Sequence, residues 1–266
     1  MTDRSEPVDA QNFLKLTLGG AIAHLRLSRP ETANAIDPTG HTELVHALRR
    51  VANDFDGKVL VISAEGKNFS AGGDFQAMED AHTSLDIRRH MSTEATELFG
   101  TLTRLNVPVI AAVHGAAAGL GATIAAACDI VVANRAAKFV DPHVVLGLVA
   151  GDGGVIAWTQ AIGFNRAKRY LLTGDRLGAV DAHAMGLVTD LVETPEEVLP
   201  AAWAIAEKIA SYPKLGVQGT KRTFNKFAQQ ASMAALELGL MLEMESFQAP
   251  ELLENVQKLR RASEKK

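Results

Sequence analysis

The chain has 266 residues, of which 47% are hydrophobic and 22% charged, and its formal net charge is −4. A chain of this length and composition can bury one sizeable core, so we expect one domain with a helical extension. The negative net charge, with lysine and arginine spread along the chain, argues against a nucleic-acid-binding protein.

The N-terminal segment, the single cysteine and the longest apolar stretch indicate in which cellular compartment the protein is expected. Residues 1–12 are polar and partly acidic, and we expect a disordered lead-in rather than a secretory signal. Cys128 is the only cysteine, which excludes an internal disulfide and fits a reducing cytosol. Residues 107–133 are long enough to suggest a membrane span, but His114 and Asp129 interrupt them, so we expect strand, turn, helix and strand. A cytoplasmic protein without a membrane partner is predicted.

The pattern along the chain predicts an α/β fold. Residues 13–18 and 21–27 are strand-like and flank Gly19-Gly20, which predicts a hairpin. Strand runs then alternate with helical patterns: helix 39–56, strand 59–63, helix 84–105, strand 109–113, helix 121–128 and strand 130–133. This alternation predicts parallel βαβ units. After about Gly154 helical patterns dominate, and we assign residues 13–200 to the α/β core and 201–266 to a C-terminal helical region.

Two turns rich in small residues follow predicted strands, at residues 69–74 and 114–121. In a parallel sheet both lie at the carboxyl edge, where ligands of α/β folds usually bind. Backbone N–H groups at a helix start are unpaired, so two of them could hold one carbonyl oxygen. The alternative is that both are ordinary turns.

Motifs spread over most of the chain closely resemble the enoyl-CoA hydratase/isomerase, or crotonase, family. They are LSRPETANAI at 27–36, SAGGDF at 70–75, PVIAAVHG at 108–115 with GLG at 119–121, LLTG at 171–174 and AMGLV at 184–188. The resemblance implies a crotonase-like βαβ superhelix with two sheets and a C-terminal helical region that forms homotrimers or hexamers. It also implies a role in the metabolism of fatty acids as coenzyme A thioesters.

The same resemblance implies how a substrate is bound. The thioester oxygen of an acyl-CoA substrate would be held by the backbone N–H groups of Gly73 and Leu120. Further contacts to CoA are expected from Arg29, Ala33, Ala71, Asp74 and Phe75. No metal and no cofactor apart from the CoA of the substrate are expected.

The chain departs from the family at both catalytic glutamates. Thr123 stands at the first glutamate position and His143 at the second. Hydration needs one group that activates water and another that delivers a proton, and threonine does neither well. His143 with Asp152, nine residues later, could form a dyad that activates water. Alternatively, His143 fills space and Asp152 caps the helix that begins near Gly154.

A second resemblance concerns this segment. The residues around His143 and Asp152 resemble those of 6-oxocamphor hydrolase, a crotonase relative that cleaves a carbon–carbon bond of a cyclic β-diketone. The similarity extends to His41 and Glu243, although His41 could be a solvated first-turn residue and Glu243 a surface charge. The retained turn at residues 71–74 favours a thioester substrate over a diketone.

Three functions follow for the chain. The first is an enoyl-CoA hydratase-family enzyme, a lyase or isomerase, that acts on an acyl-CoA or enoyl-CoA with His143 and Asp152. The second is a hydrolase that cleaves a carbon–carbon bond of a β-diketone or β-ketoacyl thioester. The third is a catalytically idle binding homologue.

Overall fold

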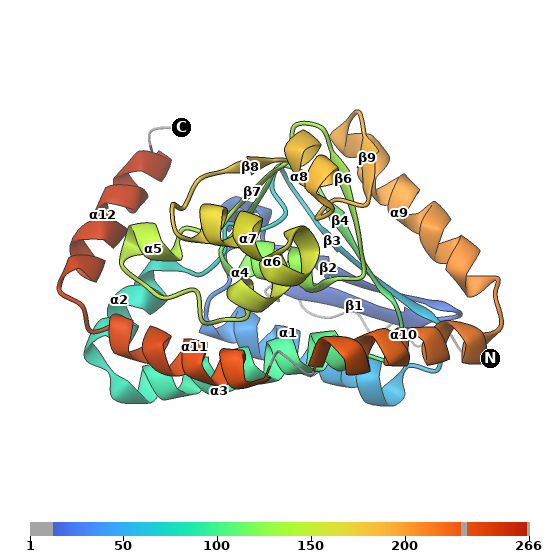
Figure 1. Cartoon of the computed structure of the whole chain (residues 1–266), viewed down its shortest axis with the longest axis horizontal. Coiled ribbons are helices and arrows are strands. Elements are labelled where there is room, and N and C mark those ends of the chain that lie inside the picture. The colour runs from blue at the N-terminus through green and yellow to red at the C-terminus, as the bar shows by residue number, and fades with distance from the viewer. Residues whose placement is uncertain (1–12, 230–232, 265–266) are drawn as a thin grey trace.

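The larger sheet has six strands, and its topology confirms the predicted α/β class. The structure, a computed structural model, describes residues 13–229 and 233–264, so the predicted lead-in lies outside the described residues. The strand order is β1 (Leu14–Gly19), β2 (Ile22–Leu27), β3 (Val59–Ala64), β4 (Val109–Val113), β6 (Ile130–Asn134) and β9 (Asp190–Val192) (Figure 1). β1 and β2 pair antiparallel as the predicted hairpin, and every following pair is parallel.

A second sheet consists of β5 (Ala116–Ala118), β7 (Lys138–Val140) and β8 (Leu177–Gly178). These strands could not be predicted from the sequence because none is long enough to show an alternating pattern. β5 follows directly from β4 through Gly115, whose positive φ of 63° suits glycine. The short sheet therefore lies beside the turns that were predicted to bind a ligand.

Helices cover the sheets on both sides. The core helices are α1 (Pro38–Asp54), α2 (Phe75–Thr83), α3 (Leu85–Arg104), α4 (Leu120–Ala127), α5 (His143–Leu146), α6 (Gly154–Ile162), α7 (Phe164–Leu171), α8 (Ala179–Met185) and α9 (Pro195–Ala210). α9 buries Val198, Ala202 and Ala206 against β3 and β4, so the boundary assigned at residue 200 falls inside a helix that packs on the sheet. Residues 107–133 form β4, α4 and β6, as predicted, and the short strand β5 lies where a turn was expected.

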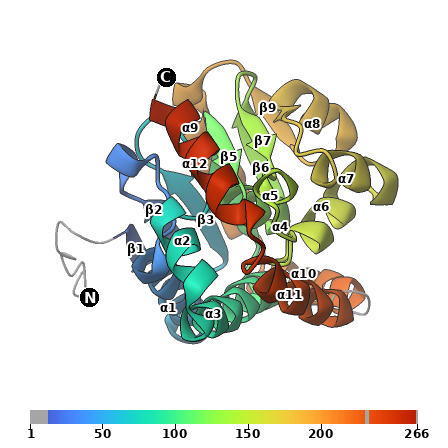
Figure 2. The ribbon, with the colours of Figure 1, turned by 90° about the vertical axis from the view of Figure 1, so that its left-hand side faces the viewer.

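The last helices are α10 (Lys214–Gln229), α11 (Met233–Ser246) and α12 (Glu251–Glu264). α11 contacts α3, and α12 packs against α2 and α5, which brings the end of the chain onto the side where α2 and α5 lie (Figure 2). Over the described ranges, no helix combines the length and apolarity needed to cross a bilayer.

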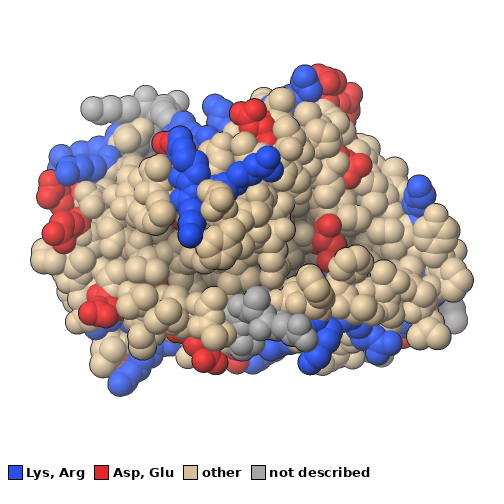
Figure 3. Space-filling view, viewed as in Figure 1, with Lys and Arg blue, Asp and Glu red and all other residues tan. Residues whose placement is uncertain are grey.

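The surface is mixed in character. Figure 3 shows side chains of both charges scattered over one face, with uncharged surface between them. α10 and α11 expose several large hydrophobic side chains, namely Leu215, Phe224, Phe227, Leu238 and Met241. Exposed apolar groups of this kind are common at subunit contacts, and the predicted trimer or hexamer stays a prediction.

Candidate active site

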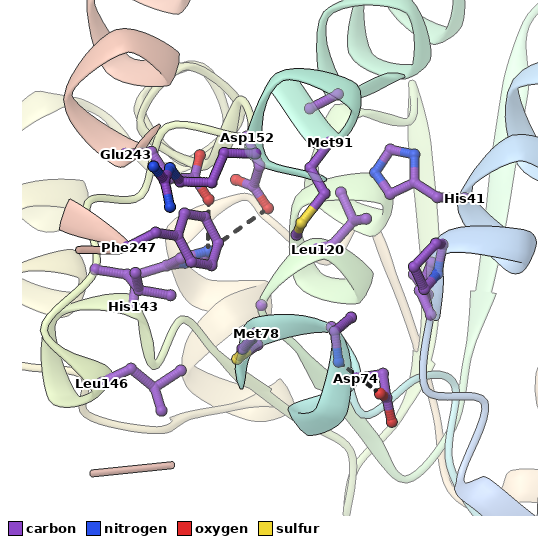
Figure 4. A pocket seen from close by; sticks show the side chains of 18 of the residues that line it. His41, Asp74, Met78, Met91, Leu120, His143, Leu146, Asp152, Glu243 and Phe247 are labelled. Carbon is purple, nitrogen blue, oxygen red and sulfur yellow. Dashed lines mark hydrogen bonds and ion pairs between the residues drawn. The ribbon is translucent and has the colours of Figure 1, made fainter. Parts of the chain in front are cut away.

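A cavity of about 140 Å³ lies between α3, α11 and the two glycine turns. α3 contributes Arg88, Met91, Ser92 and Ala95, and α11 contributes Leu240, Glu243 and Met244, followed by Phe247. Both sets recur at a spacing of three and four residues, so one face of each helix lines the cavity. Figure 4 shows Met91, Leu120, His143 and Phe247 around this space.

The two glycine turns lie side by side at the floor of the cavity. The Ser70 N–H donates to the Ala116 oxygen at 3.0 Å, and the Ala118 N–H donates to the Ser70 oxygen at 2.9 Å. Gly72 has a φ of +85°, and a Cβ there would lie 2.6 Å from the Ala118 oxygen. Only glycine allows the two backbones to approach this closely.

Two backbone N–H groups of these turns are available to a ligand. Hydrogen bonds to Ile36 fix the backbone on both sides of Gly73. The Ile36 N–H donates to the Gly72 oxygen at 2.7 Å, and the Asp74 N–H donates to the Ile36 oxygen at 3.1 Å. In the part of the chain that the structure describes, no backbone bond uses the N–H of Gly73 or of Leu120. Both residues line the cavity, and Leu120 is the first residue of α4. The two residues predicted to supply the donors therefore line the same cavity.

His143, the first residue of α5, is held by the carboxylate of Asp141, which the sequence did not predict as a site residue. The Nδ1 atom of His143 lies 2.5 Å from Oδ1 of Asp141, and the backbone N–H of His143 donates to the same oxygen at 3.1 Å. Asp141 is 1% exposed. The carboxylate that is hydrogen-bonded to the ring is therefore Asp141 and not Asp152. Asp141 precedes Pro142 in a short loop, where an aspartate usually indicates only a turn.

Asp152 and Glu243 approach the other ring nitrogen. The Nε2 atom of His143 lies 3.9 Å from Oδ2 of Asp152 and 3.8 Å from Oε1 of Glu243. Oδ1 of Asp152 accepts hydrogen bonds from the Thr123 hydroxyl at 3.2 Å and from the Gly154 N–H at 3.1 Å. Asp152 therefore accepts from the first N–H of α6, close to the capping role in the alternative, and also faces His143. Oδ2 of Asp152 is buried without a hydrogen-bond partner among the described residues.

Burial and mutual charge set the protonation of this cluster. Burial disfavours the charged ring of His143, but Asp141 and Asp152 outweigh it, and the pKa of His143 lies well above its usual value. Burial would raise the pKa of Asp141, but His143 holds it below its usual value. The pKa of Asp152 is raised mainly by burial. Burial, with the neighbouring aspartates, raises the pKa of Glu243 to about 8.

His41 lines the same cavity, across from His143 (Figure 4). Its side chain is 12% exposed, so the alternative of a solvated first-turn residue is wrong. Its Nδ1 atom lies 3.6 Å from Oε2 of Glu94, and Glu94 also accepts a hydrogen bond from Thr42. Burial, with a contribution from His90, lowers the pKa of His41 to about 4, so the ring is neutral near pH 7. The side chain of Glu243 is also 12% exposed, which excludes the surface-charge alternative.

The residues expected to bind CoA divide into two groups. Ala71, Asp74 and Phe75 line the cavity, and Asp74 also caps α2 by accepting from the Ala77 N–H at 3.0 Å. Arg29 and Ala33 do not line it. The guanidinium of Arg29 is instead engaged by Asp37 at 2.7 Å. Among the described residues, no group of three or more histidine, cysteine, aspartate or glutamate side chains could hold a metal ion.

Solved structures share this architecture. An enoyl-CoA hydratase/isomerase from Mycobacterium paratuberculosis is 34% identical, covers 94% of this chain and all of its own, and superposes with a TM-score of 0.89. A β-diketone hydrolase from Anabaena, solved with (S)-3-oxocyclohexyl acetic acid, is 26% identical, with a TM-score of 0.82 over 89% of this chain and 94% of its own.

Sequence relatives agree with the structural neighbours. A short-chain-enoyl-CoA hydratase from Clostridium acetobutylicum is 32% identical over 89% of this chain and 88% of its own. A probable mitochondrial enoyl-CoA hydratase from Dictyostelium discoideum is 35% identical over 77% and 73%. The family model for enoyl-CoA hydratase/isomerase matches residues 17–262. The chain therefore belongs to the enoyl-CoA hydratase/isomerase family, as its motifs, glycine turns and two-sheet fold indicate.

Proposed function

We propose that the protein is a hydrolase that cleaves the carbon–carbon bond between the α- and β-carbons of a β-ketoacyl-CoA thioester. One observation carries the proposal: His143, Asp152 and Glu243 converge on one wall of the cavity that also holds the free N–H groups of Gly73 and Leu120. The family pair of glutamates is absent, so hydration of a double bond lacks its usual acid and base.

The backbone N–H groups would hold the thioester oxygen. When the carbon–carbon bond breaks, its electron pair passes to the α-carbon, and the thioester becomes an enolate with negative charge on that oxygen. Donors already aimed at this position stabilise such charge without reorganisation, each by roughly 3 kcal/mol. Gly73 and Leu120 are suited to this role because their N–H groups have no acceptor among the described residues.

His143 would activate the attacking water. Its Nδ1 atom is fixed by Asp141, which leaves Nε2 as the base that faces the cavity. Because the pKa of His143 is raised, this neutral form becomes populated only as the pH rises toward that pKa. The gaps of 3.9 and 3.8 Å from Nε2 to Asp152 and Glu243 are too long for direct hydrogen bonds and suit a shared water. This water would attack the β-carbonyl and give one proton to Nε2.

Glu243 would return a proton to the product. Because its pKa is raised to about 8, Glu243 is largely protonated near neutral pH and can donate to the α-carbon of the enolate. The products are a shortened acyl-CoA and a carboxylate, and His143 can then reprotonate Glu243. Thr123, at the former glutamate position, would orient Asp152 through its hydroxyl.

The β-diketone hydrolase from Anabaena favours the same chemistry on a substrate without CoA. Its fold matches this chain with a TM-score of 0.82. The family membership and the cavity position of Ala71, Asp74 and Phe75 favour the thioester.

The test is incubation with β-ketoacyl-CoA thioesters and with cyclic β-diketones in H₂¹⁸O, followed by mass spectrometry. We expect the carboxylate product to carry one ¹⁸O atom, and His143→Ala to lower kcat by about 100-fold or more. His183→Ala is the control, because His183 bonds to the Val188 carbonyl outside the cavity. Absence of cleavage, or full activity of His143→Ala, would overturn the proposal.

A further inference from the structure

Arg88 presents a buried positive charge at the wall of the cavity. It is 6% exposed and lines the cavity from α3, on the same helix face as Met91 and Ala95. The proposed reaction does not use this residue. A guanidinium keeps its charge at every physiological pH, so burial cannot neutralise it.

The protein satisfies only one end of this guanidinium. Nη1 of Arg88 donates to the carbonyl oxygens of Ala81 and His82, at 2.6 and 3.1 Å. Both carbonyls belong to the last turn of α2, where the helix dipole favours a cation. Nε and Nη2 have no acceptor among the residues that the structure describes. Three N–H donors are therefore free for a ligand.

No carboxylate of the described chain lies within 4.0 Å of Arg88. The acids that line the cavity have other partners. Glu94 faces His41 and His90, and Asp152 and Glu243 face His143, while Asp37 and Asp74 cap helices. A buried guanidinium without a counter-ion is costly, and an anionic ligand would remove that cost.

Contacts through His82 place Arg88 near the reacting groups. The His82 carbonyl accepts from Arg88, and Nδ1 of His82 lies 2.8 Å from the Phe247 oxygen. The Phe247 N–H in turn donates to the Glu243 carbonyl at 3.1 Å. The guanidinium thus lies toward the C-terminal end of α11, near Glu243 and the Phe247 that follows the helix, and the side chains of both flank His143 (Figure 4).

We propose that Arg88 binds a carboxylate in the acyl part of the substrate, so that the protein selects thioesters whose acyl chain ends in a carboxylate. The planar fork of arginine matches a carboxylate with two parallel hydrogen bonds. This inference rests on the proposed function, which places the acyl group of the thioester in the cavity, and it adds the chemical class of that acyl group.

Calorimetry on ligand pairs that differ only by a terminal carboxylate in place of a methyl group tests the inference. Succinyl-CoA is paired with butyryl-CoA, and 5-oxohexanoate with 2-hexanone, so that one pair contains no CoA. We expect the carboxylate to bind at least about tenfold more tightly in both pairs. Arg88→Met should reduce this ratio to near one, Arg88→Lys should retain part of it, and Arg89→Met is the control because Arg89 is exposed.

The outcomes separate this inference from the proposed function. Equal affinity within each pair in the unmodified protein, or a preference that survives in folded Arg88→Met, overturns the role of Arg88. A preference that Arg88→Met removes supports it, whether or not any β-ketoacyl-CoA is cleaved. If the variant Arg88→Met is unfolded, the ratios in the unmodified protein and in Arg88→Lys decide the question.

Discussion

The substitution Asp141→Asn tests the role of the carboxylate behind His143. An amide oxygen can occupy the position of Oδ1 and accept from both Nδ1 and the backbone N–H of His143, so the geometry should persist while the negative charge is lost. The imidazolium is then buried with one neighbouring anion fewer. We expect the pKa of His143 to fall.

The size of the effect follows from the 2.5 Å contact between Nδ1 and Oδ1. A hydrogen bond with ionised partners contributes about 1.5–3 kcal/mol, and one pKa unit corresponds to about 1.4 kcal/mol. The pKa of His143 should therefore fall by about one to two units, and the acidic limb of the kcat/KM profile should move down with it. Because the ring becomes a weaker base, the plateau value should fall about tenfold or more.

Stability should change with pH in a defined direction. The pKa of His143 is higher in the folded than in the unfolded state, where it is about 6.5. The charged ring therefore stabilises the fold fully when the pH is below this unfolded pKa, and the stabilisation is lost as the pH rises through the folded pKa. Asp141 has a lowered pKa and contributes above its unfolded value. The free energy of unfolding of Asp141→Asn should thus be lower by about 1.5–3 kcal/mol near pH 6, and by less at higher pH.

NMR titration of the ¹⁵N-labelled imidazole measures the pKa, and urea denaturation at several pH values measures the stability. Asp152→Asn is the matched control, since that carboxylate lies 3.9 Å from Nε2 rather than in a hydrogen bond to the ring, and it should lower the pKa of His143 less. The reasoning is refuted if Asp141→Asn leaves that pKa unchanged, or if the stability difference is the same from about pH 5 to about pH 9.

Three further changes probe the proposed oxyanion donors, the proposed proton donor and the packing of α11. Because the pKa of Glu243 is raised to about 8, kcat should fall as pH rises above this value, and Glu243→Gln should lower kcat and abolish that limb. Leu120→Pro removes one backbone N–H at the first position of α4, which tolerates proline, and kcat should fall by about 100-fold or more. The control Leu120→Ala keeps the N–H and should reduce kcat much less. In Gly151→Ala the new Cβ would lie 2.4 Å from the Gly239 oxygen, so urea denaturation should show a free energy of unfolding that is lower by about 1–3 kcal/mol. The control Gly178→Ala, whose Cβ would have no atom within 4 Å, should change the free energy of unfolding little.

Local patterns were enough to predict the parts of the fold that are themselves local. The hairpin around Gly19-Gly20 and the buried strands β3 and β4 follow from composition and periodicity over a few residues. The N–H groups of Gly73 and Leu120 could be anticipated because small residues at strand ends leave the backbone accessible. Their pairing in one cavity came from the family resemblance.

The partners of His143 could not be predicted in the same way. Asp141 lies two residues away, and that spacing is typical of any loop. Glu243 lies on α11, and it is buried because α11 packs against the loop at Gly151. This packing is a tertiary contact, and no local pattern in the sequence indicates it. Arg88 was missed because an arginine on an amphipathic helix usually lies on the solvated face.

The cluster around His143 also changes how the C-terminal helices are understood. They were assigned to trimerisation, yet α11 supplies Glu243 to the cavity, and Phe247 follows it. The close approach that places Glu243 depends on the glycine at Gly151, where a Cβ would lie 2.4 Å from the Gly239 oxygen, and a Cβ on Gly239 would also be tight, at 3.1 Å from the Gly151 Cα. In the proposed reaction the α/β core provides the oxyanion donors and the base, while α11 provides the proton donor. A chain that lacked α11 would therefore retain the donors at Gly73 and Leu120 but lose the group that returns the proton to the product.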